Sequence, residues 1–111
     1  SVMKPGLMEL LYKRAFAYEL ECNGFSVEIE KEIPAFYKDK LIGSLKADII
    51  VDGRLILELK AANELTDANR YQLVTYLELT GIEHGLLINF GSPIMQIERK
   101  FKTYRPKVIK K

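Results

Sequence analysis

The sequence predicts an α/β (α+β) domain in which a central mixed β-sheet is flanked by helices. A chain of 111 residues, 48% apolar and 29% charged, suits one soluble globular domain with a real core. Segments with the apolar spacing of helices and segments with that of strands follow one another in the order α-β-β-β-α-β-β. Such an order favours one sheet with helices packed on it.

Residues 6–22 are expected to form the first helix. Apolar or small residues recur there at helical spacing: Leu7, Leu11, Ala15, Tyr18 and Cys22. Asn23-Gly24 ends the helix. We expect Cys22 to be a buried helix residue, because a free cysteine usually behaves as a small hydrophobe. As the only cysteine it cannot form an internal disulfide, and a reducing cytoplasm is the simplest setting for the protein.

Three strands are expected to follow. Residues 25–33 alternate apolar and polar side chains, as a half-buried strand does. Pro34 predicts an interruption, and residues 35–43 are expected to be a turn region, with a short extended piece as the alternative. Residues 45–52 and 54–61 are predicted to be two strands around an Asp-Gly turn.

The second half of the chain predicts one helix and two strands. Residues 67–80 have the pattern of a helix, with Asp67 or Thr66 as its N-cap and Gly81 at its end. The segment GLLINF at 85–90 is a short, continuously apolar strand of the kind buried on both faces. The segment QIERKF at 96–101 is predicted to be the last strand.

Asp48, Glu58 and Lys60 are charged residues inside strands that otherwise read as core. A two-residue turn would place Asp48 and Glu58 on opposite faces of the sheet. A three-residue loop at 52–54 would instead place Asp48 opposite Glu58, and Lys46 opposite Lys60. We favour the three-residue loop, because one uninterrupted apolar face then forms from Ile49, Val51, Leu55, Leu57 and Leu59.

Two facing carboxylates repel each other unless a cation bridges them. Mg²⁺ or Mn²⁺ suits such a pair, since hard cations take oxygen ligands from one or two carboxylates and from substrate phosphates. Lys60 could contact the same phosphate or the attacking water. The alternative is an ordinary ion pair of Asp48 or Glu58 with Lys60 or Lys46, and the spacing leaves both interpretations open.

Residues on the two helices could add to this site. Gln72 and Tyr76 are four apart and share a helix face, where they could orient metal-bound water or hold a phosphate. An ordinary polar helix edge is the alternative. Glu9 and Tyr12 are three apart and also share a face, so Glu9 could be a further acid near the metal. It could equally pair with Lys13 one turn later.

The basic residues concentrate at the C-terminus. Residues 99–111 hold seven of the 17 basic residues and no acid, so residues 1–98 hold 10 basic against 15 acidic groups. We therefore expect a domain at 1–101 followed by a basic tail at 102–111. The tail either contacts a phosphate backbone or is a solvated, partly disordered terminus. The expected nucleic-acid-binding residues are Lys100, Lys102, Arg105 and Lys107. No run of 18 apolar residues and no secretory signal is visible, so neither a membrane span nor export is expected.

Four segments together resemble one family. The segment GLMELLY from Gly6 matches the signature of the GxxExxY protein family at Gly6, Glu9 and Tyr12. ADIIVDGRLILELKAA resembles its Asp…Glu-Leu-Lys block, NRYQLVTYLELTG its Gln-x-x-x-Tyr helix, and HGLLINFGSP its Gly-Leu-Leu-Ile-Asn-Phe-Gly strand. The likeness spans about residues 5–95, and the family is grouped with the PD-(D/E)XK nuclease-like superfamily.

This resemblance implies a restriction-endonuclease-like core and a set of roles. Asp48 and Glu58 would be metal ligands, and Lys60 would be the catalytic lysine. Our own hypothesis adds the carbonyl of Leu59 as a third metal ligand. Glu9 would be the first-helix acid, and Gln72 and Tyr76 would be the helix pair seen in RecB-type relatives. Family members usually carry a further helix before the glycine motif, so we expect such a helix to be missing from this sequence.

The leading functional hypothesis is a Mg²⁺- or Mn²⁺-dependent phosphodiesterase that acts on DNA or RNA. The rival is a catalytically silent, nuclease-like module that binds nucleic acid or a protein partner. A third hypothesis is a small interaction or regulatory subunit whose exposed strand edge pairs with a partner or with a second copy. A core of this size leaves little surface for reading a base sequence, so an active enzyme would be non-specific, structure-specific or dependent on a partner or dimer.

Overall fold

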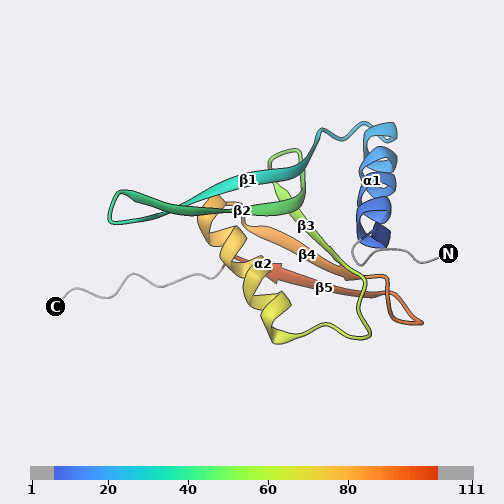
Figure 1. The fold of residues 1–111 in the computed structure, drawn as a ribbon. Coiled ribbons are helices and arrows are strands. Elements are labelled where there is room, and N and C mark those ends of the chain that lie inside the picture. The colour runs from blue at the N-terminus through green and yellow to red at the C-terminus, as the bar shows by residue number, and fades with distance from the viewer. Residues whose placement is uncertain (1–6, 103–111) are drawn as a thin grey trace.

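A computed structural model describes residues 7–102 of the chain, and its elements follow the predicted order (Figure 1). Along the chain these are α1 (Leu7–Cys22), β1 (Val27–Tyr37), β2 (Lys40–Val51), β3 (Leu55–Lys60), α2 (Asp67–Thr80), β4 (His84–Asn89) and β5 (Gln96–Phe101). The five strands form one sheet in the order β1-β2-β3-β4-β5. Only β3 and β4 pair in parallel, and the other neighbours are antiparallel. The sheet is therefore mixed, as predicted.

The two helices cover opposite faces of the sheet. Leu73 and Leu77 of α2 pack in one buried apolar cluster with Ile56 of β3. Ala17 of α1 packs in a second cluster with Leu57 of β3. Because Ile56 and Leu57 are adjacent on one strand, their side chains leave the sheet in opposite directions. The core therefore consists of two apolar layers with the sheet between them.

Helix α2 forms where the sequence predicts it, at Asp67–Thr80. The Thr66 side chain accepts the Asn69 N–H at 3.1 Å, and the Asn69 side chain accepts the Thr66 N–H at 3.0 Å. This reciprocal capping box satisfies two N–H groups at the start of the helix. Gly81 adopts the left-handed conformation, φ 79°, and its N–H donates to the carbonyl of Leu77 at 2.9 Å. Thr66 and Gly81 thus act as the predicted cap and stop.

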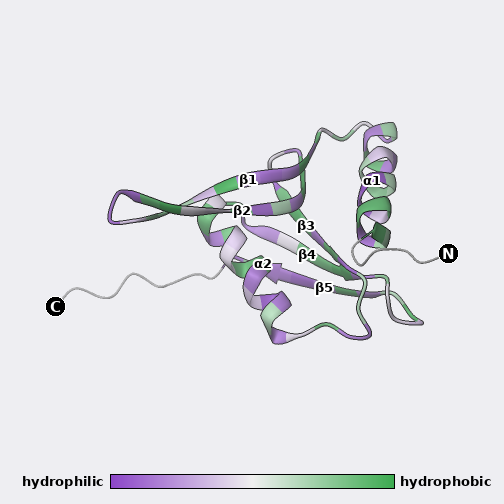
Figure 2. Cartoon of the chain, viewed as in Figure 1, coloured by the Kyte–Doolittle hydropathy of each residue, from purple (hydrophilic) through white to green (hydrophobic). Residues whose placement is uncertain are grey.

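Helix α1 ends at Cys22 as predicted, but the apolar stripe from which it was predicted is exposed to solvent. Leu11 is 50% exposed, Tyr18 is 68% exposed and Cys22 is exposed, so the prediction that Cys22 is buried was wrong. The residues buried against the sheet are Lys13 and Ala17. Figure 2 shows the resulting mixture of apolar and polar residues around α1. Small Ala17 lets the helix lie close to the sheet, and Lys13 finds an acidic partner there.

The β1–β2 hairpin is longer than predicted. The expected turn region at 35–43 is instead continuous strand, broken only at Lys38-Asp39, and the hairpin reaches away from the rest of the domain (Figure 1). Both turn residues have positive φ, 48° and 68°, as a type I′ hairpin turn requires. Pro34 lies within β1, opposite Ser44. β1 is an edge strand, where a residue without a backbone N–H is tolerated, so Pro34 does not interrupt it.

The β2–β3 hairpin has the three-residue loop. Val51 pairs with Leu55, and the Arg54 N–H donates to the Val51 carbonyl at 2.9 Å. Gly53 is left-handed, with φ 66°. This register confirms the predicted apolar face, because one cluster under α1 holds Ile49, Val51, Leu55, Leu57 and Leu59.

Strand β4 lies between β3 and β5 and is buried along most of its length, as its apolar run predicts. Gly85 leaves room for α2 there, since a Cβ at this position would come within 2.8 Å of Leu73 Cδ1. Asn89, at the end of the strand, is fully buried and accepts the N–H groups of Ala62 and Gly91 at 3.0 Å each. None of the helices in residues 7–102 has the length and apolar character needed to cross a membrane.

Candidate active site

Asp48 and Glu58 lie where β2 and β3 separate. The ladder between these strands stops at Ile49 and Leu57, one residue short of the two acids. Beyond that point, side-chain oxygens accept the backbone N–H groups in place of carbonyls. The Asp48 N–H donates to Glu58 Oε2 at 2.8 Å, and the Leu59 N–H donates to Asp48 Oδ2 at 2.8 Å. Each carboxylate is therefore fixed to the backbone of the other strand. The hairpin register brings Asp48 and Glu58 together.

The backbone is distorted on both sides of Asp48. Ala47 belongs to the cluster under α2 and Ile49 to the cluster under α1, although alternate residues of a regular strand share a face. The β1–β2 ladder pairs the residues before and after Asp48 but skips Asp48 and Glu30. Glu30 has a φ of 53°, which is uncommon for a residue with a long side chain. This irregularity lets Asp48 approach Glu58 instead of following its neighbours into either apolar layer.

Glu58 is a buried acid with an unusual ionisation. Glu58 as a whole residue is only 2% exposed. Burial, and then the nearby charge of Asp48, raise the pKa of Glu58 to about 8, against the opposing effects of the Asp48 N–H, Lys60 and Lys13. The protein therefore compensates the buried Glu58 carboxylate poorly, and the half-buried carboxylate of Asp48 lies beside it. Such a set of oxygen donors fits a hard divalent cation.

Lys60 and two residues of α2 complete this part of the site. Lys60 lies two residues after Glu58, and its Nζ donates to Gln72 Oε1 at 3.4 Å. Tyr76, one turn after Gln72, is 3% exposed and packs in the apolar cluster under α2. Burial, and then the charges of Glu58 and Asp48, raise the pKa of Tyr76 to about 12. Helix α2 thus brings Gln72 to Lys60 and Tyr76 near Glu58 and Asp48, and their role in a site stays a prediction.

The sequence interpretation missed Lys13 as a site residue. Lys13 Nζ lies 2.9 Å from Asp48 Oδ1 and 3.5 Å from Glu30 Oε2, and its side chain is 11% exposed. Burial alone would lower the pKa of Lys13, but the hydrogen bond and charge of Asp48, helped by Glu30, raise it above its ordinary value. The available signal was Ala17, a small residue one turn later on the same helix face.

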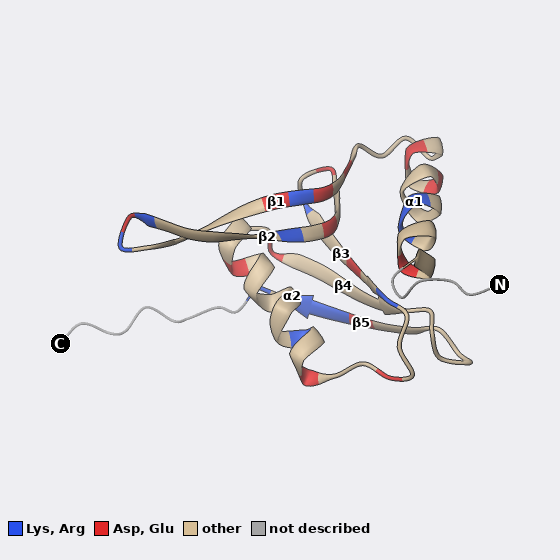
Figure 3. Ribbon diagram, viewed as in Figure 1, with Lys and Arg blue, Asp and Glu red and all other residues tan. Residues whose placement is uncertain are grey.

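Asp48 is thus in an ion pair, but its partner is neither of the lysines considered. Lys46 lies opposite Glu32 in the β1–β2 ladder and not opposite Lys60, because the β2–β3 ladder has already ended. Figure 3 shows how basic and acidic segments alternate on β1, β2 and β3 at the end of the sheet nearest α1.

The two residues expected from the start of α1 have different outcomes. Glu9 forms no ion pair within residues 7–102, with Lys13 or otherwise. In that same part of the chain, no three His, Cys, Asp or Glu side chains are grouped so that they could hold a metal. Tyr12 stacks on Phe90, with ring centroids 4.0 Å apart and planes 19° apart. The Phe90 N–H donates to the Lys60 carbonyl at 2.9 Å, so Tyr12 supports the backbone next to the site.

Residues 1–101 match the sequence description of the PD-(D/E)XK nuclease superfamily. The chain belongs to this superfamily. The finer assignment to the GxxExxY family stays a prediction. No curated protein matches the chain. The crystal structure of SSO0001 resembles this nuclease-superfamily domain with a TM-score of 0.69 and 18% identity, over 88% of this chain and 52% of that one. The domain therefore spans about half the length of that protein, and its five-stranded mixed sheet with two helices is the restriction-endonuclease-like α+β fold.

The basic tail of this nuclease-superfamily domain lies largely outside the described residues. Lys100 Nζ lies 3.5 Å from Glu98 Oε1, and the Lys102 N–H donates to the Glu83 carbonyl at 2.8 Å. Arg105 and Lys107 fall beyond residue 102, so their role in nucleic-acid binding stays a prediction.

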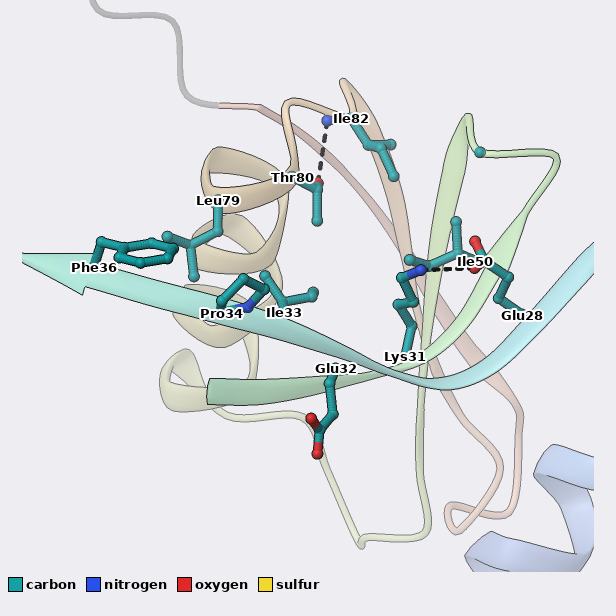
Figure 4. Close-up of a pocket in the computed structure, with 11 residues that line it drawn as sticks. Glu28, Lys31, Glu32, Ile33, Pro34, Phe36, Ile50, Leu79, Thr80 and Ile82 are labelled. Carbon is teal, nitrogen blue, oxygen red and sulfur yellow. Dashed lines mark hydrogen bonds and ion pairs between the residues drawn. The ribbon is translucent and has the colours of Figure 1, made fainter. Parts of the chain in front are cut away.

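An apolar groove of about 500 Å³ lies away from these residues, between β1 and the C-terminal end of α2 (Figure 4). Within residues 7–102, three of its four polar side chains, all but Glu32, have partners. Lys31 pairs with Glu28 at 2.9 Å, and the Thr80 hydroxyl donates to the Tyr76 carbonyl and accepts the Ile82 N–H. None of the candidate site residues lines the groove. The charged hairpin therefore remains the candidate for chemistry.

Proposed function

We propose that this nuclease-superfamily domain hydrolyses phosphodiester bonds in nucleic acid with the help of Mg²⁺ or Mn²⁺. The observation that carries the proposal is the carboxylate pair Asp48 and Glu58, fixed by reciprocal hydrogen bonds at the strand split and followed by Lys60. Membership of the superfamily supports the nuclease class.

The carboxylates of Asp48 and Glu58, with the carbonyl of Leu59, would hold the cation. The buried position of Glu58 beside Asp48 supports this assignment, because a divalent charge would compensate the Glu58 carboxylate, which the protein compensates poorly. When bound, such a cation supplies Lewis-acid stabilisation of a phosphoryl group and lowers the pKa of bound water.

The other residues act on the phosphate and the attacking oxygen. Lys60 Nζ carries a positive charge on the strand that bears Glu58, where it would stabilise the nucleophile or the phosphate oxygens. Gln72 holds that amine through its side-chain oxygen, at 3.4 Å. Tyr76, whose pKa is raised to about 12, keeps its proton at neutral pH and can act only as a neutral hydrogen-bonding group. Tyr12 and Glu9 would support the site from α1.

A cleavage assay tests the proposal. Labelled single- and double-stranded DNA and RNA are incubated with Mg²⁺ or Mn²⁺ and, in parallel, with EDTA. Glu58→Gln is expected to lower metal-dependent cleavage by about 100-fold or more. Glutamine keeps an oxygen that can accept the Asp48 N–H, so the hairpin should remain folded. The matched control is Glu64→Gln, an exposed loop residue with the same change of charge, purified identically. Cleavage that survives Glu58→Gln would contradict the proposal.

One observation favours the silent module as a second candidate. Lys13 engages Asp48 Oδ1 and the Leu59 N–H engages Asp48 Oδ2, so both oxygens of one proposed ligand already have partners. A silent module would bind nucleic acid through its basic end. Deleting residues 102–111 would then abolish binding in a mobility-shift assay, while Glu58→Gln would leave binding unchanged and no protein would cleave.

A further inference from the structure

We propose that Lys13 is a built-in counter-ion that holds Asp48 in the metal-free protein and shifts to Glu30 when a divalent cation binds. Lys13 is then a positioning residue that sets how readily the site accepts its cation. This inference rests on the proposed function only in requiring that Asp48 binds a divalent cation.

Lys13 has two acidic partners within reach, Asp48 and Glu30. Its Nζ lies between two carboxylates, 2.9 Å from Asp48 Oδ1 and 3.5 Å from Glu30 Oε2. The Asp48 side chain is 17% exposed, while the Glu30 side chain is 45% exposed and so lies nearer to solvent. A shift of the flexible lysine side chain from one acid to the other needs no backbone movement. A buried ammonium group would be costly without a partner, and here it keeps one in either position.

The backbone at Glu30 supports this reading. Glu30 adopts a positive φ of 53° inside β1, and the β1–β2 ladder skips the Glu30–Asp48 pair. A glutamate gains nothing intrinsically from this conformation, and such residues persist only where their surroundings enforce them, often at functional sites. In this conformation the Glu30 carboxylate lies within reach of Lys13, with Oε2 3.5 Å from Nζ. The chain therefore provides a second acceptor for Lys13 beside the site.

The charges balance in both arrangements. Without a cation, Lys13 neutralises Asp48. With a divalent cation at Asp48 and Glu58, an ammonium left against Asp48 would repel it, whereas an ammonium moved to Glu30 is again paired. Lys13 thus competes with the cation, and Glu30 weakens that competition. A cation that binds only one of two arrangements has its apparent affinity reduced by the fraction of protein in the other.

A double-mutant cycle on the full chain tests the exchange, with Mn²⁺ affinity measured by titration calorimetry. Lys13→Met removes the competitor and is expected to tighten Mn²⁺ binding by about tenfold. Glu30→Gln removes the negative charge of the alternative partner of Lys13 and is expected to weaken Mn²⁺ binding several-fold in the natural background. In the Lys13→Met background Glu30→Gln should have no further effect, because the competitor is gone. The matched control, Arg14→Met, removes one charge from an exposed position on the same helix and should leave the affinity unchanged.

Thermal unfolding gives a second readout. In EDTA, Lys13→Met leaves Asp48 without its counter-ion and is expected to lower the Tm by roughly 5 °C or more. Saturating Mn²⁺ should raise the Tm of this variant more than that of the natural protein. A purely structural lysine would give the loss in EDTA without the gain in Mn²⁺.

The outcomes separate the two proposals. Mn²⁺ binding to the natural protein with an unchanged or weaker affinity in Lys13→Met would overturn the role of Lys13 and leave the proposed function standing. An equal effect of Glu30→Gln in both backgrounds would do the same. No Mn²⁺ binding by any of the proteins would overturn both. If Lys13→Met does not fold, Glu30→Gln alone decides, since an unchanged Mn²⁺ affinity in that variant contradicts the exchange.

Discussion

Lys13 and Arg70 each pair a helix with an acid on a strand, and their shortest ion pairs differ in their surroundings. Lys13–Asp48 joins α1 to β2, and Arg70–Glu98 joins α2 to β5. In each, the helix supplies the base and the strand supplies the acid. The Lys13 and Asp48 side chains are 11% and 17% exposed, whereas those of Arg70 and Glu98 are 31% and 32% exposed.

The charges around Arg70 are balanced. Arg70 donates to both oxygens of Glu98, at 2.8 and 2.9 Å, and to Asp67 at 2.9 Å, and Lys100 lies 3.5 Å from Glu98. These contacts raise the pKa of Arg70 and lower that of Glu98, so each group favours the charged form of the other. This arrangement fastens α2 to the edge of the sheet.

The charges around Asp48 do not balance in the same way. A second carboxyl, Glu58, is buried beside Asp48, and its pKa is raised to about 8. Lys13 neutralises one acid, while Lys60 is held by Gln72. The two ion pairs therefore differ in function. The extra buried carboxyl beside Asp48 marks a candidate site, whereas the balanced charges around Arg70 mark a structural contact between α2 and β5.

The largest expected difference between the two pairs is in catalysis. Asp48→Asn is expected to lower metal-dependent cleavage by about 100-fold or more, because it removes a proposed metal ligand. Glu98→Gln makes the same chemical change of acid to amide in the other pair and should leave the rate unchanged. Initial rates on the best substrate of the four-substrate panel measure both. Equal losses in the two variants would place the chemistry elsewhere.

A smaller difference is expected in the response to metal. A cation at 100 times its Kd stabilises a protein by about 2.7 kcal/mol, which corresponds to several degrees in the Tm. Mn²⁺ should give this rise in the natural protein and in Glu98→Gln, and EDTA should remove it. Asp48→Asn should not respond. Differential scanning calorimetry measures the shift, and an undiminished rise in Asp48→Asn would mean that the cation binds at another position.

The hairpin and α2 were predictable from the sequence because local rules decide them. One residue of register fixes whether Asp48 faces Glu58, and the uninterrupted apolar face selected the observed register. Thr66 and Gly81 carry the chemistry of a helix start and stop, so α2 has the predicted bounds. The placement of Gln72 and Tyr76 on one face of α2 then follows from helical spacing alone.

The errors arise where a distant partner overrides a local pattern. Helix α1 buries Lys13 instead of the predicted apolar stripe because Lys13 forms an ion pair with Asp48 on β2. Asp48 lies 35 positions later in the sequence. Pro34 lies inside a strand because that strand is at the edge, which depends on the sheet order. The left-handed backbone of Glu30 has no local signal either, since glutamate does not favour it. Lys13 and Glu30 were therefore absent from the predicted site.

The smallest expected effect concerns the pH dependence of the Arg70–Glu98 pair. The hydrogen bonds from Arg70 lower the pKa of Glu98 below its unfolded value of about 4.3. An acid with a lowered pKa in the folded state stabilises the fold above its unfolded pKa, and this contribution is lost as the pH falls through its folded pKa. Arg70→Met should therefore lower the Tm at pH 7 by up to about 5 °C, since pairs this exposed contribute little.

The difference in Tm between the natural protein and Arg70→Met should shrink as the pH falls below the unfolded pKa of glutamate and then through the lower, folded pKa of Glu98. Thermal unfolding between pH 7 and pH 3 measures it. Lys31→Met is the matched control, because it removes an ion pair to Glu28 in which both side chains are 50% exposed, and it should change the Tm little at any pH. A difference that persists undiminished to pH 3 would mean that Arg70 stabilises the domain through the packing of its side chain and not through its charge. The contrast with the pair at Asp48 would then lie in burial alone.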